Sequence, residues 1–179
     1  MEEIEVPTEQ AQEEIHHHAE HSREGWVMQV ALSSAIFAVL AAIGALLAGH
    51  HSNEAVLSEI KASDKWGYFQ AKSIKADVLD SRLAMLAALG KPAASSDLER
   101  QSKLAEEKIE ISKKAKELEE EGESHLRTHV VLAKSVTMFQ VTIAIGAIAV
   151  LTKRRRFWLV SLVVGAVGIA FFIQGLLTR

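Results

Sequence analysis

Hydrophobic and charged residues are segregated along this chain into separate blocks. Residues 27–48 and residues 157–178 each contain 22 residues without a charge, and residues 130–152 carry one charge, Lys134. A helix needs about 20 predominantly apolar residues to cross the hydrocarbon core of a bilayer. The remaining sequence is heavily charged and offers no large domain in which such helices could be buried. We therefore predict three transmembrane helices, at 26–49, 130–152 and 157–178.

Residues 50–129, between the first two apolar blocks, mix charged residues with apolar ones at helical spacing. Gly90 suits the left-handed end of a helix, Pro92 cannot continue one, and Ser96 with Glu99 forms a capping box that would open the next. The pattern predicts two helical arms with a turn near 90–96. We expect narrow apolar seams to join the arms, as in an antiparallel coiled coil: Leu57, Ile60, Tyr68, Ala71, Ile74, Val78, Met85 and Leu89, facing Leu98, Ala105, Ile109, Ile111, Ala115, Leu118 and Leu126.

The predicted fold class is thus an all-α integral membrane protein. Three transmembrane helices carry a long antiparallel, coiled-coil-like helical hairpin between the first and the second. Seams this thin rarely hold two helices together alone, so we expect a homo-oligomer. A net charge of −3 gives no electrostatic support for nucleic-acid binding. The chain has no cysteine, which excludes disulfides and thiolate metal sites.

The short loops predict how the chain is oriented. Residues 1–25 form an acidic, histidine-rich segment with eight Glu and one Arg, too long and too acidic to open a secretory signal. Residues 153–156 read Lys-Arg-Arg-Arg, and such a cluster in a short loop favours the cytoplasmic side. This orientation puts the N-terminus in the cytoplasm, the hairpin 50–129 outside it, and Trp26 and Trp158 at the same membrane interface.

Several segments also resemble a known family. The opening EEIHHHAEHSREGW, then QVALSSAIFAVLAAIGALLAGHHSNEA and KASDKWGYFQAKSIKA, are similar to a bacterial membrane-protein family catalogued as domain of unknown function 4337. The similarity covers nearly the whole chain. The resemblance implies the membrane topology and a bacterial origin, and it implies no catalytic residues. Together with the apolar blocks, this leads us to expect a location in the bacterial inner membrane.

Histidine is the residue type placed most suggestively, in two groups of four. In the first group, His17 and His21 lie one helical turn apart and could supply two metal ligands, although we prefer to explain them as part of an amphipathic or disordered juxtamembrane stretch. The second group is His50, His51, His125 and His129. If the hairpin folds back, these four meet near one membrane boundary. They then form a site for Zn²⁺ or a similar divalent transition metal, a pH-sensitive cluster, or simply an interfacial set of amphipathic residues.

The apolar blocks contain no Asp, Glu or Arg, which argues against a pump or an active transporter. Ser34, Gln140 and Thr142 are polar residues within the spans, and they serve either close helix packing or a pore. Repeated small residues four apart, such as Ser161-x-x-x-Gly165, favour packing.

No catalytic pattern stands in a credible context, so we expect a non-enzymatic membrane scaffold that binds the bilayer, copies of itself and a protein partner at the hairpin. The alternative is an oligomeric ion channel with the histidine cluster at its extracytoplasmic mouth.

Overall fold

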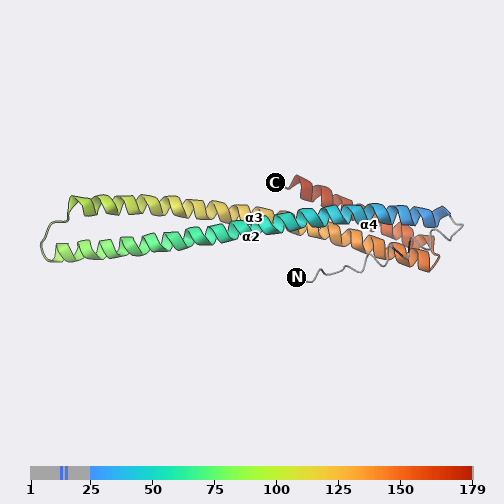
Figure 1. Ribbon diagram of the computed structural model, residues 1–179, viewed down its shortest axis with the longest axis horizontal. Helices are drawn as coiled ribbons and strands as arrows, with labels where there is room; N and C mark the ends of the chain where they lie inside the picture. The colour runs from blue at the N-terminus through green and yellow to red at the C-terminus, as the bar shows by residue number, and fades with distance from the viewer. Residues whose placement is uncertain (1–12, 14, 16–24, 179) are drawn as a thin grey trace. The chain divides into compact units, whose positions relative to one another are not determined.

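The computed structural model describes residues 13, 15 and 25–178, and the continuous stretch contains three helices (Figure 1). Helix α2 spans Gly25–Ala88, α3 spans Ser95–Leu151 and α4 spans Arg155–Leu177. Each contains a segment that is long and apolar enough to cross a membrane, and at most 39% of any such segment is buried by the protein itself. The fold is therefore all-α, and its three apolar helices indicate a membrane protein. Most of the acidic segment 1–25, including His17 and His21, lies outside the described residues.

The chain reverses between α2 and α3 through a backbone motif centred on Gly90. The Gly90 amide donates to the Ala87 carbonyl and the Lys91 amide to the Leu86 carbonyl, with Gly90 at a φ of 67°. These two bonds satisfy carbonyls that the helix end would otherwise leave unpaired. On the far side, the Ala94 carbonyl accepts from Asp97 and Leu98. Ser96 therefore lies inside the first turn of α3, and the predicted capping box placed the start of this helix too late.

The same motif ends α3, but without a glycine. The Lys153 amide donates to the Val150 carbonyl and the Arg154 amide to the Ala149 carbonyl, while Lys153 itself takes a φ of 53°. A left-handed conformation is unfavourable for a residue with a Cβ. The reversal is completed within three residues, so α4 begins at Arg155, earlier than the sequence predicted. Arg155 and Arg156 consequently lie in the first turn of α4 and not in a loop.

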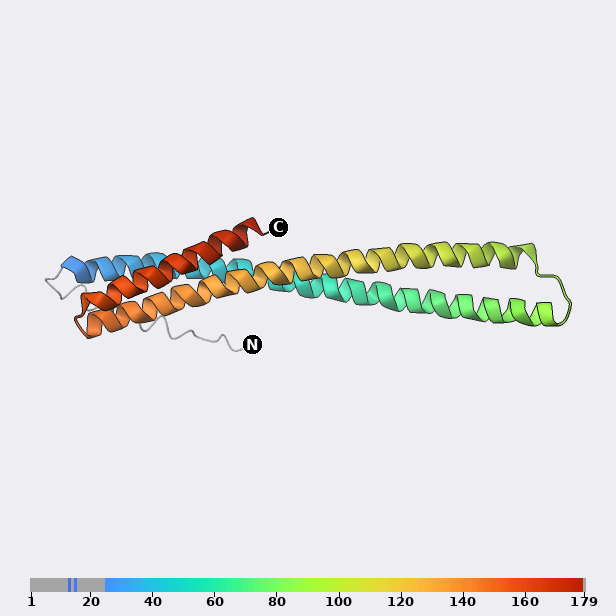
Figure 2. The same cartoon turned by 180° about the vertical axis from the view of Figure 1, so that it is seen from behind.

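The structure divides into two compact units. Unit 1 consists of residues 1–52 and 126–179, and unit 2 of residues 53–125. In unit 1, α4 lies against the N-terminal part of α2 and the C-terminal part of α3 (Figure 2). Phe37 of α2 stacks on Phe139 of α3 with ring centroids 5.7 Å apart, and Phe139 meets Phe172 of α4 at 6.2 Å. These three rings join the three helices of unit 1.

The α4 face that packs in unit 1 is built of small residues. Its buried residues are Ser161, Gly165, Gly168 and Gly175. A Cβ built on Gly168 would lie 2.8 Å from two ring atoms of Phe139, and one on Gly175 would lie 2.6 Å from a methyl group of Leu132. The small residues on this face allow α4 to approach the aromatic and leucine side chains closely.

In unit 2, the seam predicted on α2 is largely wrong. Its members are exposed: Leu57, Ile60, Tyr68, Ile74, Val78, Met85 and Leu89 each expose 41% or more of their surface. The buried residues of α2 in this unit are instead Ala55, Ser58, Ala62 and Leu79. On α3, Ile111, Ala115 and Leu118 are buried as predicted, whereas Leu98, Ile109 and Leu126 are exposed.

Polar contacts flank the face that α2 presents to α3 in unit 2. Trp66 Nε1 donates to Glu119 Oε1 at 2.7 Å, Lys72 pairs with Glu107, Gln101 donates to Asp80 at 2.6 Å, and Arg82 lies 3.3 Å from Asp97. As the position along α2 rises from 66 to 82, its partner along α3 falls from 119 to 97. Small residues on the buried face let the helices approach, and these polar pairs flank it.

Candidate functional site

The turn between α3 and α4 has an aromatic and basic environment. Trp158 Nε1 donates to Ser33 Oγ at 3.3 Å, and Ser33 in turn donates to the Val30 carbonyl at 2.9 Å. The guanidinium of Arg155 lies over the Trp158 ring, 5.5 Å from its centroid. An indole with its N–H satisfied and a cation on its face is suited to a boundary between hydrocarbon and water.

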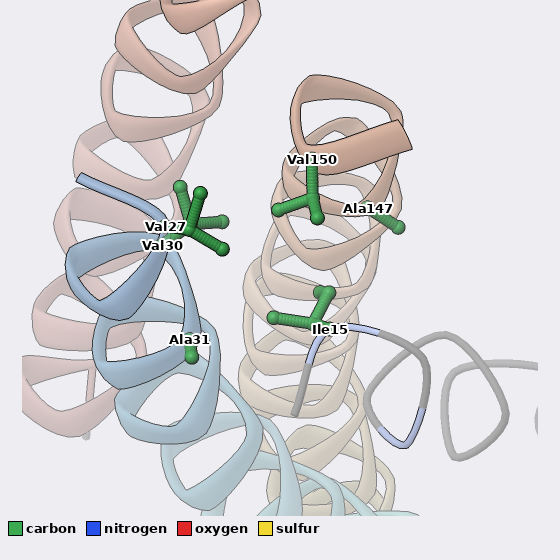
Figure 3. Packing of buried hydrophobic residues seen from close by; sticks show 6 residues of the cluster. All are labelled: Ile15, Val27, Val30, Ala31, Ala147 and Val150. Carbon is green, nitrogen blue, oxygen red and sulfur yellow. The ribbon is translucent and has the colours of Figure 1, made fainter. Parts of the chain in front are cut away.

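Trp26 and Trp158 pack against one apolar cluster in unit 1. Its members come from α2, from the end of α3 and from the N-terminal segment (Figure 3): Ile15, Val27, Val30, Ala31, Ala147 and Val150. Ile15 is only 1% exposed. Sequence reasoning missed this residue, because Ile15 is flanked by glutamates and histidines and has no apolar periodicity around it.

The predicted four-histidine set is split between the two units, with His50, His51 and His129 in unit 1 and His125 in unit 2. The His50 and His51 rings meet edge to face, with centroids 5.4 Å apart. The Nδ1 of His129 lies 2.8 Å from the Ala48 carbonyl oxygen. A carbonyl oxygen only accepts, so the Nδ1–H group donates this hydrogen bond, which links α3 to α2.

Over residues 25–178 and the two described residues before them, no three His, Asp or Glu side chains come together as a group that could bind a metal ion. His129 serves as a hydrogen-bonding link between two helices of unit 1. The zinc site and the pH-sensitive cluster both stay predictions.

Two of the three polar residues singled out within the spans are buried inside unit 1. Ser34 is 4% exposed and Thr142 is 3% exposed. Thr142 donates to the Met138 carbonyl one turn earlier in its own helix, and a Cβ on Gly146 would lie 3.2 Å from Ser34 Oγ. These contacts favour helix packing as their role. Gln140 is only partly buried.

The centre of unit 2 carries a compact group of charged and aromatic side chains. Lys72 bonds to Glu107 across the two helices, with 15% and 31% of the side chains exposed. The ammonium of Lys72 also lies 5.3 Å from the centroid of the Tyr68 ring, and that of Lys108 lies 5.6 Å from the Phe69 ring. The hydrogen bond with Glu107, followed by one with Tyr68, raises the pKa of Lys72, and the same Lys72 bond lowers the pKa of Glu107. Both ionised forms are thus stabilised, which suits a structural contact and not proton transfer near neutrality.

Comparison with known proteins gives one result. A family model described as "Domain of unknown function (DUF4337)" matches residues 26–178. No curated protein and no solved structure matches the chain. The matched segment begins at Trp26 and runs through all three helices, so it covers both units. The chain therefore belongs to the family of the domain of unknown function DUF4337.

Proposed function

We propose that this chain is a non-enzymatic, membrane-anchored helical scaffold of a bacterial inner membrane. Its three apolar helices hold it in the bilayer, and residues 50–129 form an antiparallel helical hairpin that makes protein contacts within a homo-oligomer. The observation that carries the proposal is the opposed order of the polar pairs in unit 2, from Trp66–Glu119 at one end to Arg82–Asp97 at the other. Two helices paired in this way present most of their surface to partners.

The exposed apolar side chains of unit 1 support the membrane anchor. Leu32 exposes 64% of its surface, Leu46 76% and Leu177 77%. Contiguous apolar surface of this extent is rare on proteins surrounded by water. Lipid hydrocarbon covers such side chains without the cost that water would impose.

The basic turn supports the proposed sidedness. Lys153 and Arg154 lie in a short connection, Arg155 and Arg156 follow in the first turn of α4, and Lys and Arg near helix ends favour the cytoplasmic side. In the proposed topology, the N-terminus and this turn are cytoplasmic and the hairpin is extracytoplasmic.

Cysteine labelling tests the topology directly, because the chain has no cysteine of its own. Lys91→Cys, in the exposed turn after α2, and Arg154→Cys, in the exposed turn after α3, provide a matched pair. A membrane-impermeant maleimide added to intact cells is expected to label Lys91→Cys alone, and both variants after lysis. If only Arg154→Cys is labelled in intact cells, the topology is the opposite of the proposed one. If both variants are labelled in intact cells, the proposed topology is wrong.

Ion flux from liposomes separates the scaffold from a channel. The purified chain in liposomes is expected to leak ions no faster than empty liposomes do. Of the three polar residues singled out within the spans, Ser34 and Thr142 are buried within one protomer, so Gln140 is the one of these three that could line a pore between protomers. If the chain conducts ions and the Gln140→Leu variant does not, the channel hypothesis is correct and the scaffold hypothesis is wrong.

A further inference from the structure

One apolar stripe on α2 faces away from α3 within unit 2. We call Ala71, Ile74, Val78 and Met85 the outer stripe. Ile74 exposes 63% of its surface, Val78 67% and Met85 66%. The four residues follow one another at intervals of three, four and seven. That spacing keeps them on one side of a helix and is the spacing of a coiled-coil seam.

The outer stripe is distinct from ordinary scattered surface residues. Single exposed apolar side chains are common and need no explanation. Here Ile74, Val78 and Met85 are larger and more hydrophobic than Ala55, Ser58 and Ala62, three of the four residues that α2 buries in unit 2. Leu57 and Ile60 continue the same register toward the start of unit 2, although Asp64 and Gly67 interrupt it.

The residues that flank the outer stripe differ on its two sides. In the heptad that puts Ala71 and Val78 at position a, the e positions hold Lys75 and Arg82, and the g positions hold Gln70 and Asp77. In a parallel pair of helices, a g residue faces the e residue five positions later on the other helix. Asp77 then faces Arg82 of the second copy, and Gln70 faces Lys75. An antiparallel pair would place cations against cations along the e row.

Arg82 can make this contact without giving up its own. Its guanidinium lies 3.3 Å from Asp97 in the same chain, yet 64% of the side chain is exposed. A guanidinium has five N–H donors, so one Arg can bond two carboxylates.

We propose that the outer stripe packs against the outer stripe of a second copy of this chain, with the two α2 helices parallel. The proposal rests on the proposed membrane anchor, because copies inserted with the same sidedness leave the bilayer in the same direction. It specifies which surface makes the contact between copies, which the scaffold proposal does not. The interface is symmetric, which is the commonest arrangement among homo-oligomers.

Disulfide cross-linking of the full chain in membranes tests the contact. Ala71→Cys, Val78→Cys and Met85→Cys, made one at a time and oxidised with copper phenanthroline, are each expected to give a product of twice the chain mass. Ile109→Cys on α3 is the matched control, because Ile109 is 70% exposed but lies outside the stripe. An antiparallel contact would bring only one of the three positions next to itself. Cross-linking at one position alone, or equally at Ile109, would overturn the proposal.

A second variant separates this contact from oligomerisation through the membrane helices. Ile74→Glu with Val78→Glu puts carboxylates in the stripe, and both side chains are already exposed in the single chain, so the protomer is expected to keep its helical circular dichroism. Cross-linking of Met85→Cys in this background should be lost. An oligomer that persists, with cross-linking unchanged, would sink the outer-stripe contact while leaving the scaffold in place. A chain that extracts from membranes without detergent would instead sink the membrane anchor itself.

Discussion

Replacing Gly168 by alanine tests whether α4 is held by close packing. The added Cβ would lie 2.8 Å from Cδ1 and Cε1 of Phe139 and 3.1 Å from Cβ of Met138. Phe139 is fully buried, and its ring is confined between Phe37 and Phe172. The ring therefore has no free space into which to move, and the helices must separate to admit the methyl group.

The size of the effect follows from two opposing terms. Overpacking a well-packed site costs about 1–3 kcal/mol, whereas alanine is favoured over glycine within a helix by up to about 1 kcal/mol. Gly49→Ala isolates the second term, because nothing lies within 4 Å of a Cβ at that position. The difference in unfolding free energy between the two variants should therefore be about 1–3 kcal/mol, with Gly168→Ala the less stable.

The unfolding free energy can be measured in mixed micelles by titration with SDS, followed by the fluorescence of the chain's tryptophans. Phe139→Leu supplies a compensating change, because a smaller side chain makes room for the methyl group. The double variant should be more stable than the sum of the two single changes predicts, by an amount in the range of about 0.5–3 kcal/mol that is typical of residues in contact. If Gly168→Ala proves as stable as Gly49→Ala, the close approach of α4 is refuted.

Three further predictions concern the turn after α3 and the pairs of unit 2. Lys153→Gly should stabilise the chain by about 1 kcal/mol in the same titration, because it relieves a left-handed conformation; Lys153→Ala, which removes the same charge, should not. Glu107→Gln should lower the melting temperature at pH 7. Because the Glu107 pKa lies below its ordinary value of 4.5, the pair's stabilisation is present above that value and is lost as the pH falls through the folded-state pKa. The two melting curves should therefore converge in acid, and a constant offset would contradict the ion pair. Trp66→Phe removes the donor to Glu119 and should cost about 0.5–1.5 kcal/mol, measured by thermal unfolding followed by circular dichroism; no change would mean that the bond contributes nothing.

The sequence predicted the features of the fold that depend only on neighbouring residues, such as the apolar helices and the turn at Gly90. The apolar blocks required membrane-length helices, and Gly90 followed by Pro92 required a reversal, because each depends on the residues concerned and not on a distant partner. The second reversal was harder to place. Lys153 adopts the conformation that glycine usually supplies, so no residue type marked where α3 ends.

Helix packing was less predictable, because it depends on which of several faces meets a neighbour. In unit 2, apolar periodicity pointed to the face that contains Ile74 and Val78, yet Ala62 and Leu79 are buried instead. The spacing of apolar residues shows that a helix has an apolar stripe, but it does not show which neighbour that stripe contacts. The spacing of Ser161 and Gly165 was more informative, since a helix face built of small residues favours close approach of a neighbouring helix.

The histidines likewise show that sequence spacing does not determine which side chains meet in the folded chain. The sequence brings His129 and His50 to corresponding places on two helices, and four imidazoles in one region suggest a metal site. The hydrogen bond from one nitrogen of His129 to the Ala48 carbonyl was not indicated by this spacing. Spacing identifies residues that are able to act as ligands, whereas only geometry shows whether their lone pairs converge.

In unit 2, one face of α2 packs against α3 and the opposite face carries the outer stripe, so pairing of α2 with α3 and the proposed dimer contact are coupled. The face that meets α3 is rich in small side chains, and it is flanked by polar partners such as Glu119 and Glu107 on α3. The outer stripe would bury more hydrophobic surface if it met α3 in their place. A second copy that covers Ile74 and Val78 removes this competing arrangement, so the dimer contact and the observed pairing within the chain stabilise each other. Loss of the Trp66 and Lys72 contacts together should therefore weaken cross-linking at Val78→Cys, although neither residue belongs to the outer stripe.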